Sequence, residues 1–97
     1  MFARVNRWPS LKPEAIEDFR TETVPAARRM PGIRELLLLF DRETERAISI
    51  SLWESREDML ASEPAAQQLR DQDVQTGLAS EAPVVERYEV VVREGAP

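Results

Sequence analysis

The side chains with the clearest chemical potential are an amide and an indole on two segments with strand-like alternation. Asn6 lies in the middle of FARVNRW (residues 2–8), and Trp53 closes AISISLW (residues 47–53). A buried carboxamide can hold a substrate oxygen or stabilise a developing enolate or peroxide. An indole at a strand end offers an apolar wall and one N–H donor, which suits a flat aromatic ligand. We take Asn6 and Trp53 as candidate catalytic residues; the alternatives are a paired amide and a core or dimer-contact aromatic.

Three further side chains are candidate substrate-binding groups. Arg4 could bind an anionic ligand group, or it could pair with Glu86 or Glu89 on a neighbouring strand. Tyr88 has a hydroxyl that could donate to a substrate or to superoxide, or it could be a packed side chain with an exposed tip. Ser51 keeps its strand face narrow, and with no base beside it we do not expect it to act as a nucleophile.

Two residue types used widely in catalysis and metal binding are missing. The chain has no Cys and no His, which rules out a thiolate nucleophile, a Ser-His-Asp triad and a histidine-ligated metal. The closest carboxylate motif, Asp71-Gln72-Asp73, opens like a calcium loop but has Thr76 where glycine is required and Ala82 where the closing glutamate belongs. We interpret it as a solvated helix face and expect neither a metal nor another cofactor.

Charge and hydropathy limit the classes of partner. The net charge of -5 argues against nucleic acid and anionic membranes, because both require a basic surface. No apolar run approaches the ~20 residues needed to span a bilayer. Met1 is not followed by an apolar signal segment, so we expect a cytoplasmic location. The length of 97 residues predicts one domain, residues 1–97.

The first half of the chain predicts a strand, a helix and a second strand. Pro9 ends the strand at residues 2–8. A helix begins within residues 10–14, where Pro13 suits the first turn, and Pro25 predicts a kink or a restart within it. Met30-Pro31-Gly32 ends the helix. Residues 33–41 then form a strand whose nearly continuous apolar run indicates burial on both faces.

The second half predicts a hairpin, a two-part helix and a last strand. The loop at residues 41–46 leads into the strand at 47–53, which has one apolar face and one small-polar face closed by Trp53. One of these faces must pack in the hydrophobic core, and the other must contact a different part of the protein or a partner. Ser55 and Asp58 resemble a capping box, and a second helix start follows at Ser62-Glu63-Pro64. Its outward residues are Gln67, Gln68, Arg70 and Asp71.

The sequence allows that helix to end anywhere between Val74 and Pro83. A strand then follows at residues 84–92, before a short tail. The resulting order is βαββαβ, an α+β ferredoxin-like fold with a four-stranded antiparallel sheet and two helices on one face. Because helices cover one face only, an apolar second face predicts a homodimer in which two sheets face each other. Such an interface would bury ~800 Å² per subunit.

Several segments resemble the antibiotic biosynthesis monooxygenase (ABM) family of the dimeric α+β barrel superfamily. The resemblance lies in residues 24–33 (VPAARRMPGI), in the hairpin after them, and in residues 52–58 (LWESRED) followed by residues 62–64 (SEP). It implies a dimeric barrel with a ligand cavity between helices and sheet in each subunit. Enzymes of this family oxidise aromatic polyketide or quinol-type substrates with molecular oxygen, without metal or flavin.

One branch of the resembled family degrades haem with a strand Asn, a strand-end Trp and a helix His. Asn6 and Trp53 stand where the first two would fall, and the third falls near Glu63. Because the chain has no His, the resemblance does not extend to histidine ligation of haem.

The leading hypothesis is a homodimer that binds a small aromatic molecule, as a cofactor-independent monooxygenase acting on a quinol, phenolic or aromatic polyketide-type substrate with O2. Such a reaction requires a dry pocket and proton removal, because the substrate supplies the electrons. The alternative is a non-catalytic ligand-binding or stress-associated dimer of the same fold. RNA binding by the sheet is not expected, because AISISLW lacks a stacking platform.

Overall fold

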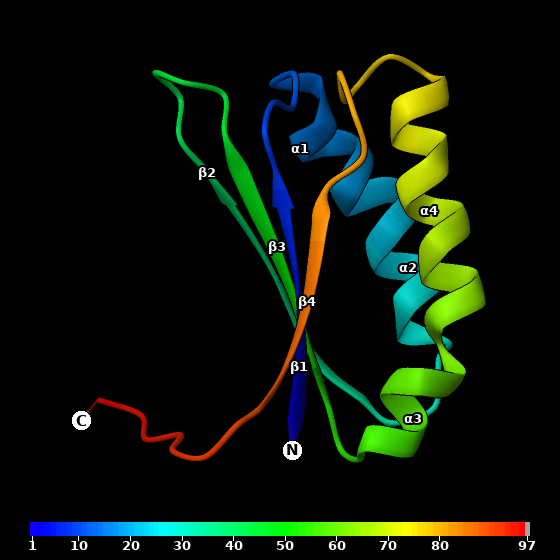
Figure 1. Cartoon of the computed structure of the whole chain (residues 1–97), viewed down its shortest axis with the longest axis vertical. Helices are drawn as coiled ribbons and strands as arrows, with labels where there is room; N and C mark the ends of the chain where they lie inside the picture. The colour runs from blue at the N-terminus through cyan, green and yellow to red at the C-terminus, as the bar shows by residue number, and fades with distance from the viewer. Residues whose placement is uncertain (97) are drawn as a thin grey trace.

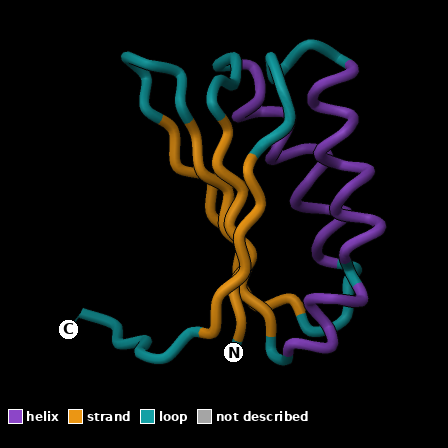
Figure 2. Tube along the Cα trace, in the orientation of Figure 1, coloured by secondary structure: helices purple, strands orange, loops and turns teal. Residues whose placement is uncertain are grey.

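A four-stranded antiparallel sheet is the central element of the protein (Figures 1 and 2), described by a computed structural model for residues 1–96. The strand order is β2-β3-β1-β4, and every neighbouring pair is antiparallel. This arrangement confirms the predicted ferredoxin-like fold. The strands are β1 (Phe2–Trp8), β2 (Ile33–Phe40), β3 (Ala47–Trp53) and β4 (Val84–Glu89).

All helices lie on one side of the sheet (Figure 1). The first helical segment comprises α1 (Glu14–Asp18), the π-helix η1 (Phe19–Thr23) and α2 (Val24–Arg28), and the second comprises α3 (Arg56–Ala61) and α4 (Glu63–Gln75). Within residues 1–96, none of these helices has the length and apolar character needed to cross a bilayer.

Pro25 is accommodated by the π-helix and not by a break. The Val24 N–H donates to the Phe19 carbonyl, five residues back. Pro25 has no N–H, and its ring would crowd the carbonyl four residues earlier in a regular α-helix. The wider π turn changes the hydrogen-bond register just before the proline, and π segments of this kind occur frequently at functional sites.

The second helical segment follows the predicted start signals. The Asp58 backbone N–H donates to Ser55 Oγ over 3.1 Å, which caps α3. Pro64 lies in the first turn of α4, where its missing N–H removes no hydrogen bond. The structure places the end of α4 at Gln75, and Gly77 follows with a φ of +79°.

The two faces of the sheet differ in polarity, and the helices cover the polar one. Ser49, Ser51 and Trp53 of β3 point toward the helices and line the interior, so their strand neighbours Ile48 and Ile50 point to the opposite face. That opposite face is largely apolar, with the Arg7–Glu86 ion pair as an exception, and no helix or strand of residues 1–96 covers it (Figure 1).

One expectation for the strands is wrong, and another depends on a partner. Within one chain, Leu37 and Leu39 of β2 lie on the open face and are 41% and 48% exposed, so burial of both faces of β2 remains a prediction that requires a second copy. β4 ends at Glu89 and not at residue 92. The Val90 N–H makes the last bond, to the Met1 carbonyl at 2.9 Å. Since β1 begins at Phe2, the next residues have no partner strand, and Val91 is 80% exposed.

A tight approach near Gly32 positions the start of β2 against α3. Gly32 has a φ of +80°, and a Cβ added there would overlap the Asp58 side chain. We expect Gly32→Ala to lower the free energy of unfolding by about 1–3 kcal/mol, because both the backbone and the space favour glycine. Urea unfolding measures this effect. Gly95→Ala is the matched control, since a Cβ there meets nothing within 4 Å; equal effects of the two substitutions would contradict the expectation.

Candidate functional site

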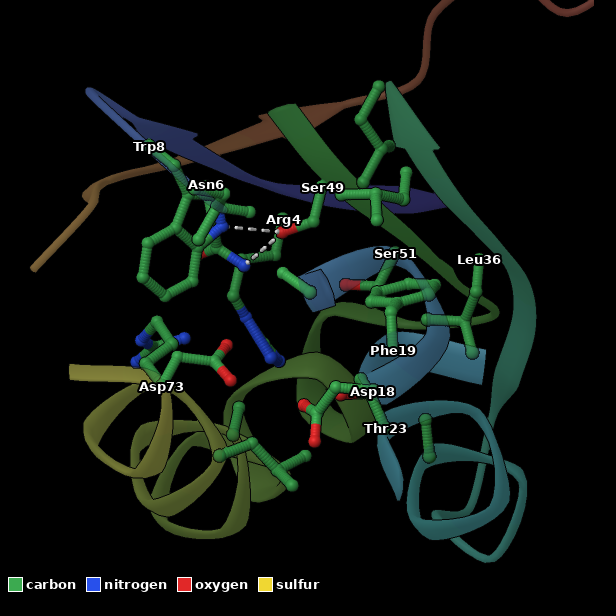
Figure 3. Close-up of a pocket in the computed structure, with 18 of the residues that line it drawn as sticks. Arg4, Asn6, Trp8, Asp18, Phe19, Thr23, Leu36, Ser49, Ser51 and Asp73 are labelled. Carbon is green, nitrogen blue, oxygen red and sulfur yellow. Dashed lines mark hydrogen bonds between the residues drawn. The ribbon is translucent and has the colours of Figure 1, made fainter. Parts of the chain in front are cut away.

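A cavity of about 80 Å³ lies between the polar face of the sheet and the helices (Figure 3). Its walls combine apolar side chains with polar and charged ones. The polar lining residues include Arg4, Asn6, Asp18, Thr23, Ser49, Ser51, Arg70 and Asp73. Phe19 and Thr23 of the π-helix also line it.

Asn6 lies at the centre of the sheet wall. Its Nδ2 donates to Ser49 Oγ over 2.9 Å, and Trp8 Nε1 donates to the same oxygen over 3.4 Å (Figure 3). Asn6 Oδ1 is buried and has no hydrogen-bond partner among the described residues. A buried carbonyl oxygen without a donor is destabilising by about 1–3 kcal/mol, so this atom is a ready acceptor for a ligand hydroxyl.

Trp53 forms an end wall of the cavity and is 1% exposed. Its Nε1 donates to Ser51 Oγ over 2.8 Å, which fixes the orientation of the indole. The Arg4 guanidinium carbon lies 5.2 Å from the centre of the Trp53 ring, within the range of a cation–π interaction.

Arg4 is 2% exposed and lines the same end of the cavity. Its guanidinium donates to Ser62 Oγ and to the Met59 carbonyl, and its Nε lies 3.5 Å from Glu63 Oε1. The alternative cross-strand pair with Glu86 does not form. Glu86 pairs with Arg7 at 2.6 Å, because both side chains lie on the open face of the sheet.

The structure brings four of the five candidate residues together and separates the fifth. Arg4, Asn6, Ser51 and Trp53 all line the cavity. Tyr88 is paired with Ala3 across β1 and β4 and is 49% exposed on the opposite face of the sheet.

Sequence reasoning missed two carboxyl groups on opposing helices. Asp18 of α1 and Asp73 of α4 point toward the same space (Figure 3). Burial, the negative charge of Asp18 and a hydrogen bond with that carboxyl raise the pKa of Asp73 to about 6. The expected solvated helix face is therefore wrong for Asp73. The signal was its spacing, because Asp73 continues the stripe of Ala66 and Leu69 at helical intervals.

Arg70 was expected to point outward, and this expectation is also wrong. It is 6% exposed and lines the cavity, with its Nη2 donating to Gln67 Oε1 over 2.8 Å. No group of three or more His, Cys, Asp or Glu that could hold a metal ion occurs in the part of the chain that the structure describes.

The raised pKa of Asp73 predicts a pH-dependent stability. The folded state binds this proton more readily than the unfolded chain, so stability falls as the pH rises from 3.8 through about 6. At neutral pH the ionised carboxylate is destabilising. We expect Asp73→Asn to raise the free energy of unfolding by about 1–2 kcal/mol at pH 7.5 and to change it little at pH 4, as measured by urea unfolding.

Asp71→Asn removes the same charge from an exposed position of α4 and serves as the control for this measurement. A gain for Asp73→Asn that is equal at the two pH values would contradict the assignment.

No family model matches the sequence, and no curated protein matches it. Its fold is similar to several solved structures. A monooxygenase from the gene ActVA-Orf6 of Streptomyces coelicolor, in complex with nanaomycin D, has a TM-score of 0.72 at 16% identity, covering 99% of this chain and 89% of that one. A variant of MhuD with two manganese protoporphyrin IX molecules per active site has a TM-score of 0.72 at 20% identity, covering 99% and 100%.

A protein from Deinococcus radiodurans assigned to the antibiotic biosynthesis monooxygenases has a TM-score of 0.70 at 16% identity, covering 100% of this chain and 99% of that one. At these identities the likeness establishes the fold. The chain therefore has the fold of the antibiotic biosynthesis monooxygenases, as the resemblance in its sequence indicates.

Proposed function

We propose that this protein is a homodimer that binds a small, flat aromatic molecule in the cavity and oxidises a quinol or phenolic substrate with O2, without a cofactor. The observation that carries the proposal is the unpaired Asn6 Oδ1 in the cavity wall. A phenolic hydroxyl donating to this oxygen would satisfy it, while the indoles of Trp8 and Trp53 provide apolar walls for a ring. The complex of the Streptomyces coelicolor relative with nanaomycin D supports a small-molecule ligand.

The cavity volume refines the substrate class. About 80 Å³ is well below the ~300 Å³ of typical drug-sized pockets. This volume favours a one-ring phenol or quinol over an aromatic polyketide-type substrate. A polycyclic ligand would require the α1–α2 segment to move away from the sheet.

The proposed oxidation requires the protein to remove a proton from the substrate and to exclude water from the cavity. Asp73 is the proposed proton acceptor, because it lines the cavity and its pKa of about 6 lies close to neutrality, where a general base is effective. The proton of one substrate hydroxyl passes to the Asp73 carboxylate, and in a quinol the second hydroxyl donates to Asn6 Oδ1. O2, the co-substrate, then oxidises the phenolate: one oxygen atom bonds to a ring carbon in place of hydrogen and the other leaves as water, so that a phenol becomes a quinone and a quinol becomes a hydroxyquinone. Proposed supporting roles are orientation of the substrate oxygen by Asn6 and of the Trp53 indole by Ser51.

The residues present do not fit haem. The chain has no His or Cys to serve as an axial ligand. Glu63, near which the helix His of the haem-degrading branch would fall, accepts two hydrogen bonds from Arg87 at 2.8 and 2.9 Å. A cavity of about 80 Å³ is also too small for a porphyrin, so we derive no step through haem.

Substitutions in the cavity test the site. With a panel of hydroquinone, naphthohydroquinone and resorcinol, we expect enzyme-dependent O2 uptake in an oxygen electrode. Asn6→Ala should lower kcat/KM by about tenfold, as expected for loss of one hydrogen bond to the substrate, and Trp53→Phe should raise KM. Tyr88→Phe, on the opposite face of the sheet, is the control and should leave both parameters unchanged.

Unchanged turnover in the Asn6 and Trp53 variants would contradict the site. Binding of the panel compounds without O2 uptake would instead identify the non-catalytic ligand-binding dimer.

The apolar open face of the sheet supports the proposed dimer. Leu37 and Leu39 of β2, Val84 of β4 and the strand residues between them form its surface. We expect light scattering at micromolar concentration to show a dimer, and Leu39→Glu to shift it toward monomer because a buried unpaired carboxylate opposes association. Val74→Glu, on a helix, is the control. A monomeric parent protein would contradict this proposal.

A further inference from the structure

Three arginines share one glutamate at the Trp53 end of the cavity. Glu63 Oε1 lies 2.8 Å from Arg87 Nε and 3.5 Å from Arg4 Nε, and Glu63 Oε2 lies 3.7 Å from Arg70 Nη2. Three guanidinium groups and one carboxylate give this group a formal charge of +2. Asp71, which also attracts Arg70, is exposed and accepts a hydrogen bond from Gln67.

The shortest contacts to Glu63 are made by Arg87, the most exposed of the three arginines. Arg87 has a side chain that is 41% exposed, yet it makes both short hydrogen bonds to Glu63, and these raise its pKa. Arg4 and Arg70 are 2% and 6% exposed, and their contacts with Glu63 are the longer ones, at 3.5 and 3.7 Å. Burial, followed by repulsion from neighbouring arginines, lowers the pKa of both, and Glu63 offsets this only in part.

The guanidinium groups of Arg4 and Arg70 have N–H donors that make no hydrogen bond within the described residues. Arg4 Nε, Arg70 Nε and Arg70 Nη1 have no hydrogen-bond partner among residues 1–96 and are closed off from solvent. Both side chains line the cavity. Removing a cation from water without a full counter-charge is destabilising, so an anionic group at this position would stabilise the fold as well as bind.

The two ends of the cavity differ in charge. Arg4 lies beside Trp53 and shares Glu63 with Arg70. The Asp73 carboxyl pairs with Asp18, and the Asp73 carbonyl accepts from the N–H of Ala79, which is bridged to Leu11. A planar carboxylate matches the guanidinium fork. A ring between the indoles would direct a hydroxyl group to the opposite, acidic end.

We propose that Arg4 and Arg70 form an anion subsite of this cavity, and that its ligand is an aromatic carboxylate with a phenolic hydroxyl at the far end of the ring. This inference rests on the proposed function and specifies its substrate class.

The first test compares the binding of a charged and an uncharged probe to the unaltered protein. 4-Hydroxybenzoate and 4-hydroxybenzamide have nearly the same shape, and only the former carries a charge at pH 7.5. Quenching of the fluorescence of Trp8 and Trp53, checked by calorimetry, reports binding. We expect the acid to bind at least tenfold more tightly than the amide.

Equal or weaker binding of the acid, with the amide still bound, overturns the anion subsite and leaves the proposed function standing. Binding of neither probe contradicts both.

The second test removes one guanidinium group. Arg70→Gln should weaken 4-hydroxybenzoate binding at least tenfold, to the level of 4-hydroxybenzamide, and leave binding of the amide unchanged. Arg20→Gln removes the same charge from an exposed position and should change neither affinity. An equal loss for both probes in folded Arg70→Gln overturns the proposal. Arg70→Lys keeps the charge without the fork and should show intermediate affinity for the acid, which decides the matter if Arg70→Gln does not fold.

Discussion

The structure depends on the antiparallel register between β1 and β3. Arg4 lies opposite Ser51, and Asn6 lies opposite Ser49, so the polar residues of the two central strands share one face. A shift of one residue in either strand would exchange its faces. It would turn Ile48 or Ile50 toward the helices and move the polar side chains away from them. The identity of the site is therefore a consequence of strand pairing before it is a consequence of helix packing.

This register gives the protein an interior that is less apolar than its open sheet face. The buried cluster of Trp8, Leu11, Ala15, Ala47 and Ala79 packs only one end of the space under the helices. Polar pairs such as Asn6 with Ser49 occupy the middle, and the arginines occupy the other end. Small and polar side chains leave space where large aliphatic ones would fill it, which explains why a cavity remains in so short a chain.

The same register leaves hydrophobic burial unfinished on the other side of the sheet. Leucine and valine side chains of β2 and β4 remain partly exposed on a face without helices. The stabilisation available from covering that face grows with the apolar area removed from water. A proposed dimer and a polar interior with a proposed ligand site are thus two results of one alternation pattern.

Local signals in the chain were sufficient for most of the fold. Alternation identified β1 and β3, Ser55 and Pro64 identified the starts of α3 and α4, and the order of elements identified the ferredoxin-like topology. These features depend on neighbours close in sequence, where the periodicity of strands and the geometry of helix caps act directly. Asn6 and Trp53 stand out for the same reason, as exceptional side chains at strand positions, and both line the cavity.

Tertiary structure alone decided which polar residues share the interior. Asp18 looks like a solvent-facing acid within its own helix, and Arg70 looks like one more outward charge. The spacing of Asp73 places it on the apolar stripe of α4, but no local signal identifies the groups it meets there. Their environments come from residues of other elements: Asp18 for Asp73, and Arg87, which is hydrogen-bonded to Glu63, for Arg70. The end of β4 was likewise decided by where β1 begins. Helical period and strand alternation determine the direction of a side chain relative to its own element, whereas the pKa and pairing of a buried charge depend on the other elements that surround it.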